Sequence, residues 1–164
     1  MKISIITVSD SVSRGGHADV SGDTIAEWAV ARGDILVSRA LVADESAEIV
    51  RALLAACDSG ESEVVLTTGG TGLSERDVTP EATRAVIDSE VQGFGEQLRS
   101  HAARFPRASL SRGIAGIRGR TLIVNLPGSP SGVRDGLGTL DKIVDHACDV
   151  LSGRVGQHGT VDGA

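Results

Sequence analysis

The residues of this chain best suited to chemistry are a short glycine-rich segment and the charged pair that follows it. Residues 67–72 have the sequence TTGGTG and come directly after the apolar run 64–66, and Arg76 and Asp77 lie shortly beyond them. Glycines at a strand end expose backbone N–H groups, which bind anions such as phosphate. On this interpretation Asp77 holds Mg²⁺ and Arg76 neutralises phosphate charge. A tight turn with an exposed ion pair is the alternative that involves no function.

This glycine-rich segment differs from the common nucleotide-binding loops. It has neither the G-x-x-x-x-G-K-[ST] pattern of a Walker A loop nor the G-x-G-x-x-G pattern of a dinucleotide-binding turn. The next helix is predicted to begin only at Thr79 and Pro80, with the threonine as its cap and the proline at its first position. Since a helix N-terminus is not close to the loop, the glycine N–H groups themselves must form any anion site.

The elements around the glycine-rich segment predict where other functional residues gather. Apolar runs predict strands over 3–8, 35–42, 63–67 and 121–126. Helical patterns lie between them, and the β-α-β order predicts a mostly parallel sheet. Ligands bind outside the carboxyl ends of such strands. The loops at those ends are expected to meet at one edge, and they contain Ser9 and Asp10, Asp44, residues 67–77 and residues 127–131.

Several of these loop residues also have a purely structural interpretation. Asp44 stands where the N-cap of a helix ending at Gly60 is expected. Ser131 is suited to cap the last helix, and residues 111–113 (SRG) supply either a hydroxyl and a guanidinium to a ligand or simply an exposed loop. The residues alone leave these alternatives open.

The predicted architecture is a three-layer α/β/α fold in one domain, residues 1–153, with a flexible tail over 154–164. We expect a loop over 11–22 and a first helix that begins at Thr24 and ends at Gly33. We also expect a helix over 91–105 and a loop with an edge strand over 109–119. Apolar spacing from Val133 to Leu151 predicts one long final helix.

Composition excludes some functions. Among 164 residues only 2% are aromatic and the net charge is −6, which argues against nucleic-acid binding. Cys57 and Cys148 lie in helical patterns without a second ligand at metal-binding spacing, so we expect two buried thiols. Scarce cysteines, an N-terminus unlike a signal peptide and no apolar run of about 20 residues favour a cytoplasmic protein with no membrane partner.

Linked motifs in order make the chain resemble a known family. Residues 67–72 together with 76–82, residues 111–119 and residues 125–130 resemble the signature of the MogA/MoaB proteins of molybdenum-cofactor biosynthesis. The Cnx and gephyrin G domains are relatives of these proteins. The resemblance covers about residues 2–152. Val20 departs from it, because a basic or polar residue is common at that place in the Asp-x-Ser-Gly segment.

The resemblance implies a molybdopterin-binding fold, assembled as trimers or hexamers, and transfer of AMP from Mg-ATP to the terminal phosphate of molybdopterin. It implies that Asp44 and Asp77 are the catalytic aspartates, and we expect both to hold Mg²⁺. Handover of the product to a MoeA-type insertase is a further expectation. From the loops and the resemblance together, the residues expected to contact substrate or phosphate are Ser9, Asp10, Thr68, Gly69, Gly70, Thr71, Gly72, Arg76, Ser111, Pro127, Gly128 and Ser129.

The chemistry of this reaction limits the role of the aspartates. A phosphate monoester has a second pKa of about 6, so the attacking phosphate is mostly ionised at neutral pH and needs no general base. We therefore expect the aspartates to act through Mg²⁺. One alternative is a catalytically silent molybdopterin carrier or scaffold of the MoaB type. Another is a related enzyme: MoeA-type insertases carry extra domains, and CinA-type hydrolases differ after the glycine loop.

Overall fold

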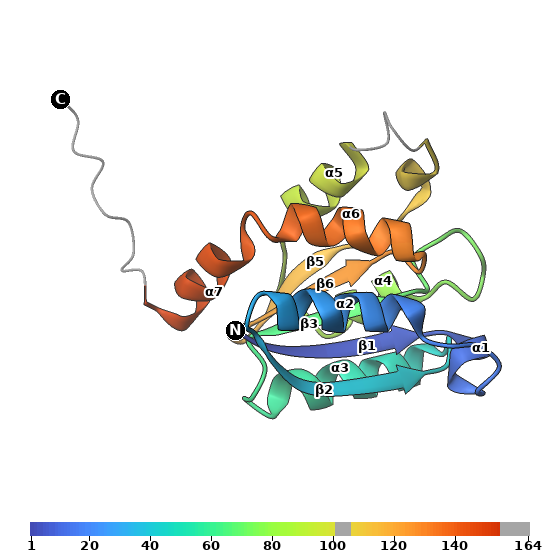
Figure 1. Ribbon diagram of the computed structural model, residues 1–164, viewed down its shortest axis with the longest axis horizontal. Helices are drawn as coiled ribbons and strands as arrows, with labels where there is room; N and C mark the ends of the chain where they lie inside the picture. Colours follow the sequence, from blue (N-terminus) through green and yellow to red (C-terminus); the bar gives the residue numbers. More distant parts are fainter. Residues whose placement is uncertain (101–105, 155–164) are drawn as a thin grey trace.

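The computed structural model describes residues 1–100 and 106–154, which build one six-stranded sheet with helices on both faces (Figure 1). The strand order is β2-β1-β3-β6-β5-β4. The first four strands of this order are parallel, and β5 and β4 continue the sheet in antiparallel pairing. The strands are β1 (Lys2–Val8), β2 (Ile35–Val42), β3 (Val64–Thr68), β4 (Ser89–Glu90), β5 (Ala115–Arg118) and β6 (Thr121–Leu126).

The helices cover the sheet on both faces, which confirms the predicted three-layer α/β/α fold class. They are α1 (Asp10–Ser13), α2 (Val20–Ala31), α3 (Ser46–Asp58), α4 (Thr79–Arg84), α5 (Gln92–Ser100), the 3₁₀ helix η2 (Pro106–Leu110), α6 (Pro130–Leu140) and α7 (Val144–Ser152). Successive strand residues point to opposite faces. Ile5 and Leu66 therefore pack in a core beneath α2 and α6, whereas Ile6 and Val65 pack in a second core beneath α3.

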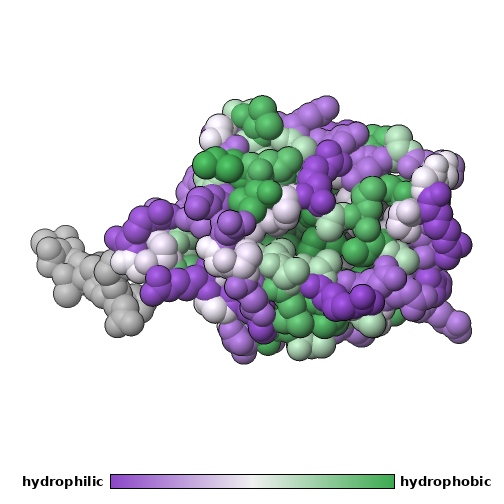
Figure 2. All heavy atoms as spheres, turned by 90° about the horizontal axis from the view of Figure 1, so that it is seen from below, coloured by the Kyte–Doolittle hydropathy of each residue, from purple (hydrophilic) through white to green (hydrophobic). Residues whose placement is uncertain are grey.

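The sheet is open on the side of β2. Two apolar side chains of this edge strand, Ile35 and Leu41, are 60% and 51% exposed. Figure 2 looks at the molecule from this side and shows apolar patches between hydrophilic side chains. Among the described residues no helix combines the length and apolar character needed to span a bilayer.

The predicted loop over 11–22 is wrong at both ends. Asp10–Ser13 form the single turn α1, and α2 begins at Val20 rather than at Thr24. The start of α2 is fixed by Asp19, whose carboxylate accepts a hydrogen bond from the N–H of Gly22. An N-cap aspartate satisfies one of the unpaired N–H groups of the first turn. This local bond outweighs the low helix propensity of Gly22.

The C-terminal half contains three further differences. The predicted final helix is two helices, α6 and α7, separated by a turn at residues 141–143. β5 is not an edge strand, because the unpredicted β4 pairs with its outer side. Of the predicted helix over 91–105, residues 101–105 lie outside the described part, as does the predicted tail except for Arg154.

Candidate functional site

Two glycines of the loop after β3 have backbone conformations and surroundings that other residues cannot share. Gly69 and Gly70 have φ angles of 95° and 63°. A Cβ atom on Gly69 would lie 2.1 Å from the carbonyl oxygen of Val8, and one on Gly70 would lie 2.3 Å from Oγ1 of Thr79. The glycines therefore let the loop approach the end of β1 and the start of α4 closely.

The loop is anchored by four consecutive carbonyl groups. The carbonyl of Gly69 accepts a hydrogen bond from the Thr79 hydroxyl (2.9 Å), and that of Gly70 accepts one from the Thr79 N–H (3.0 Å). The carbonyl of Thr71 accepts from the Arg112 N–H (2.8 Å), and that of Gly72 accepts from Arg112 Nε (2.7 Å). Thr79 is thus the first residue of α4, and it anchors the loop through its hydroxyl and its N–H. The prediction that its side chain caps the helix is wrong.

The opposite sides of these four peptides carry N–H groups that are available to a ligand. In a trans peptide the N–H points away from the carbonyl of the preceding residue. The N–H groups of Gly70, Thr71, Gly72 and Leu73 therefore point away from Thr79 and Arg112, and within the described part of the chain none of them donates a hydrogen bond. Successive N–H groups without partners are what a phosphate-binding loop requires.

A second loop, residues 127–130, packs against the glycine loop. Its position is fixed by Thr68, whose hydroxyl donates to the Pro127 carbonyl (2.7 Å), and by Ser21, whose hydroxyl donates to the Gly128 carbonyl (2.8 Å). Ser129 caps α6 by accepting from the Gly132 N–H, so the suggested cap at Ser131 is wrong. Beside this contact lies a cavity of about 350 Å³, lined by Ser9, Thr68, Gly69 and Gly128 among others.

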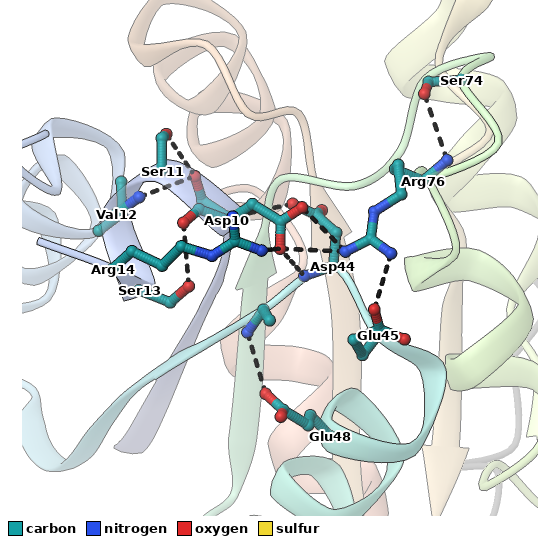
Figure 3. Close-up of polar contacts among 12 residues, drawn as sticks. Asp10, Ser11, Val12, Ser13, Arg14, Asp44, Glu45, Glu48, Ser74 and Arg76 are labelled. Atoms are coloured by element: carbon teal, nitrogen blue, oxygen red, sulfur yellow. Dashed lines mark hydrogen bonds and ion pairs between the residues drawn. The ribbon is translucent and has the colours of Figure 1, made fainter. Parts of the chain in front are cut away.

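On the other side of the glycine loop, carboxylates from the ends of β1 and β2 face one another (Figure 3). The N–H of Asp10 donates to the Asp44 carboxylate (2.8 Å), and the N–H of Asp44 donates to the Asp10 carboxylate (3.3 Å). The interpretation of Asp44 as a helix cap is therefore wrong, since α3 begins after Glu45 and has no side-chain cap. Arg76 reaches across from the glycine loop to Asp10 (2.8 Å) and Glu45 (2.7 Å).

The surroundings of Asp10 and Asp44 shift the pKa values of these two carboxyl groups in opposite directions. The hydrogen bond from Arg76 lowers the pKa of Asp10. Partial burial raises the pKa of Asp44, and the negative charges of Asp10 and Asp77 act in the same direction. Asp44 thus lies near two other carboxylates, an arrangement that favours an added cation.

The carboxylates are suited to a metal ion whose remaining ligands come from the phosphates of a bound substrate. Within residues 1–100 and 106–154, no three His, Cys, Asp or Glu side chains are arranged to hold a metal by themselves. Mg²⁺ is commonly bound by one or two carboxylates together with substrate phosphates and water. Asp44 and Asp77 fit that role, because each comes from a loop at this edge and the negative charge of Asp77 is close enough to raise the pKa of Asp44.

The structure brings most of the predicted site residues to one edge of the sheet, and it adds others. Ser111 precedes Arg112, which bonds to the glycine loop, and its own hydroxyl accepts a hydrogen bond from the Gly113 N–H (3.4 Å). Sequence reasoning missed Glu45 as a partner of Arg76, and it did not assign Arg112 to the glycine loop. The Ser-Arg-Gly segment at residues 111–113 was the only sequence feature that pointed to Arg112. Its contact with the glycine loop depends on tertiary structure, so the segment alone could not reveal it.

Comparisons with known proteins identify the family of this chain. A family model described as a probable molybdopterin binding domain matches residues 4–146. The chain belongs to this molybdopterin-binding family. The match includes the glycine loop and both aspartates, and it confirms the resemblance to the MogA/MoaB proteins.

Members of the molybdopterin-binding family with similar sequences have assigned activities. The molybdopterin adenylyltransferase of Escherichia coli K12 is 40% identical over 155 residues, which cover 92% of this chain and 77% of that protein. The molybdopterin adenylyltransferase of Helicobacter pylori J99 is 38% identical over 157 residues, covering 92% and 88%. The molybdopterin biosynthesis enzyme MoaB from Thermus thermophilus has a similar structure, with a TM-score of 0.87, 42% identity and coverage of 93% and 96%.

Proposed function

We propose that this protein transfers AMP from ATP to the terminal phosphate of molybdopterin in molybdenum-cofactor biosynthesis. The observation that carries the proposal is the row of N–H groups from Gly70 to Leu73, which have no partner in the described structure and lie in a loop beside Asp44 and Asp77. The relatives of this protein that are named molybdopterin adenylyltransferase are similar to it over most of the chain, and they support the same reaction.

The proposed reaction balances without an acid or base from the protein. An oxygen of the molybdopterin phosphate attacks the α-phosphorus of ATP, and the bond from that phosphorus to the bridging oxygen breaks. The products are adenylyl-molybdopterin and pyrophosphate. Because the attacking phosphate is already ionised near neutral pH, the main obstacle is repulsion between two polyanions. Catalysis then depends on positioning and on charge stabilisation.

Each part of the site has a role in this proposal. The N–H groups of the glycine loop hold phosphate oxygens, and Asp44 and Asp77 hold Mg²⁺, which neutralises phosphate charge. Arg76, 48% exposed, is able to turn from Asp10 and Glu45 to a bound phosphate. Ser9, Thr68 and Gly128 line the cavity beside the glycine loop. We expect Pro127, Ser129 and Ser111 to contact substrate from the neighbouring segments. A homotrimer or hexamer, a cytoplasmic location and handover to a MoeA-type insertase remain predictions.

Incubation with molybdopterin, ATP and Mg²⁺ tests the proposal. We expect adenylyl-molybdopterin and pyrophosphate in equal amounts, with no pyrophosphate when molybdopterin is omitted. Tight binding of molybdopterin without pyrophosphate release would instead identify a silent carrier. The relatives named molybdopterin adenylyltransferase favour the active enzyme over this alternative.

A further inference from the structure

Arg112 makes an unusual set of contacts with the glycine loop. The residue lies between η2 and β5, far from the loop in sequence. Its main-chain N–H donates to the Thr71 carbonyl. In its side chain, Nε donates to the Gly72 carbonyl and Nη2 donates to the Asp77 carbonyl. Its remaining nitrogen, Nη1, forms an ion pair with Glu81 of α4. One residue therefore links both ends of the segment from Thr71 to Asp77.

These contacts argue against Arg112 as a group that binds substrate directly. Every nitrogen of its guanidinium already has a partner, and its charge is balanced by Glu81. The planar guanidinium holds several acceptors in a fixed geometry, which the single ammonium group of a lysine cannot reproduce. What the contacts do fix is the orientation of the peptides that they bind.

Because peptide groups are planar, the bonds of Arg112 to the loop carbonyls also fix the direction of the N–H groups that a ligand would meet. Because the peptides are trans, holding the carbonyls of Thr71 and Gly72 toward Arg112 turns the N–H groups of Gly72 and Leu73 to the opposite side. Without the Arg112 side chain the Gly72 carbonyl would lose its anchor, whereas the Thr71 carbonyl would keep its bond to the main-chain N–H of residue 112. The N–H of Leu73 would then have to be ordered at the moment of binding. Ordering flexible groups costs binding free energy.

We propose that Arg112 is a positioning residue that holds the N–H groups of Gly72 and Leu73 toward a bound phosphate and fixes the main chain of Asp77 next to them. The inference rests on the proposed function for the identity of the substrate, but its physical content concerns any phosphate anion. Thr79 does the same for the N–H groups of Gly70 and Thr71 through the carbonyls of Gly69 and Gly70.

The test uses NMR spectra of the ¹⁵N-labelled full chain titrated with inorganic pyrophosphate in the presence of Mg²⁺. The variant is Arg112→Lys, which keeps the charge opposite Glu81 but cannot bridge the carbonyls of Gly72 and Asp77. The matched control is Arg118→Gln. Arg118 also joins a carboxylate, Asp58, to a main-chain carbonyl, that of Val86, but at the opposite edge of the sheet.

We expect the amide signals of Gly72 and Leu73 to move on titration of the unaltered protein. Arg112→Lys should weaken pyrophosphate binding about tenfold or more, the loss expected for one or two hydrogen bonds to a charged group. Arg118→Gln should bind as the unaltered protein does. A role limited to stability would lower the melting temperature of both variants and leave pyrophosphate affinity unchanged in both.

The inference is wrong if Arg112→Lys binds pyrophosphate within twofold of the unaltered protein. It is also wrong if the Gly72 and Leu73 amides of the unaltered protein do not respond, a result that needs no variant to fold. If these amides respond and Arg112→Lys loses affinity, yet the unaltered protein forms no adenylyl-molybdopterin, the inference holds and the proposed function fails.

Discussion

The two ends of the parallel strands differ in how their polar groups are satisfied. At the carboxyl end, a cavity of about 350 Å³ is lined by Ser9, Thr68, Gly69 and Gly128 among others, and the aspartates lie on the other side of the glycine loop. At the amino end, a larger cavity of about 500 Å³ is lined by Cys57, Cys148, Asp88 and Arg118 among others. On size alone the amino end would be the better candidate for a ligand site.

The polar contacts favour the carboxyl end as the ligand site, in spite of its smaller cavity. Around the larger cavity, Arg118 donates to Asp58 and to the Val86 carbonyl, and Asp88 accepts from the Gly119 N–H. These groups satisfy one another and the main chain. At the carboxyl end, by contrast, the loop carbonyls are anchored while the N–H groups on their far side point away from those anchors. The comparison indicates that groups fixed in place and still available to a ligand distinguish a site better than volume does.

The largest expected difference between the two ends is catalytic. Asp77→Asn keeps an oxygen that can accept from the Ser74 N–H, as Asp77 does at 2.8 Å, but removes the charge expected to hold Mg²⁺. We expect AMP transfer to fall about 100-fold or more, with partial recovery at high Mg²⁺. The matched control, Asp88→Asn, keeps an acceptor for Gly119 and should leave the rate unchanged. Full activity of Asp77→Asn at all Mg²⁺ concentrations would exclude the proposed role.

A smaller difference is expected in stability. Gly70 and Gly119 have similar φ angles, 63° and 57°, but a Cβ atom would meet Thr79 Oγ1 at 2.3 Å in the first case and nothing within 4 Å in the second. Gly119→Ala should cost about 1–2 kcal/mol of unfolding free energy from backbone strain alone. Gly70→Ala should cost clearly more and should also abolish pyrophosphate binding. Urea unfolding measures both, and equal losses would show that the contact with Thr79 is unimportant.

The smallest effect on activity is expected at the thiols of the amino end. Burial raises the pKa of Cys57 and of Cys148 to about 11. At pH 7 a thiol with that pKa is about 10⁻⁴ ionised, compared with about 3% for an ordinary cysteine, so labelling should be slowed by about 10²-fold in the folded state. Cys57→Ser should keep full AMP transfer. Rapid labelling of the native protein, or loss of transfer, would point to a function for the larger cavity.

Local sequence patterns predicted much of the fold. The strand β2 was predicted with its observed bounds, Ile35–Val42, because this mostly apolar run lies between Asp34 and the Ala-Asp pair at residues 43–44. The break between α6 and α7 was not predicted. Leu140 and Val144 remain four residues apart across it, so the apolar spacing continues and hides the turn.

The site shows the same limit of local information. Because parallel strands carry their following loops to one edge, the sequence predicted that Asp10, Asp44 and residues 67–77 would meet there. It could not predict that Arg76 would pair with Asp10 and Glu45, since a guanidinium on a loop has many possible partners. The contacts of Arg112 depend on how the segment before β5 lies against the glycine loop, which no spacing in the sequence records.

A crystal structure with Mg²⁺ and a non-hydrolysable ATP analogue would test the difference between the two ends most directly. We predict that phosphate oxygens lie within hydrogen-bonding distance of the N–H groups between Gly70 and Leu73, with the metal ion between the phosphates and Asp44 and Asp77. A nucleotide bound instead in the cavity lined by Cys57 and Arg118, with the glycine loop empty, would contradict the account.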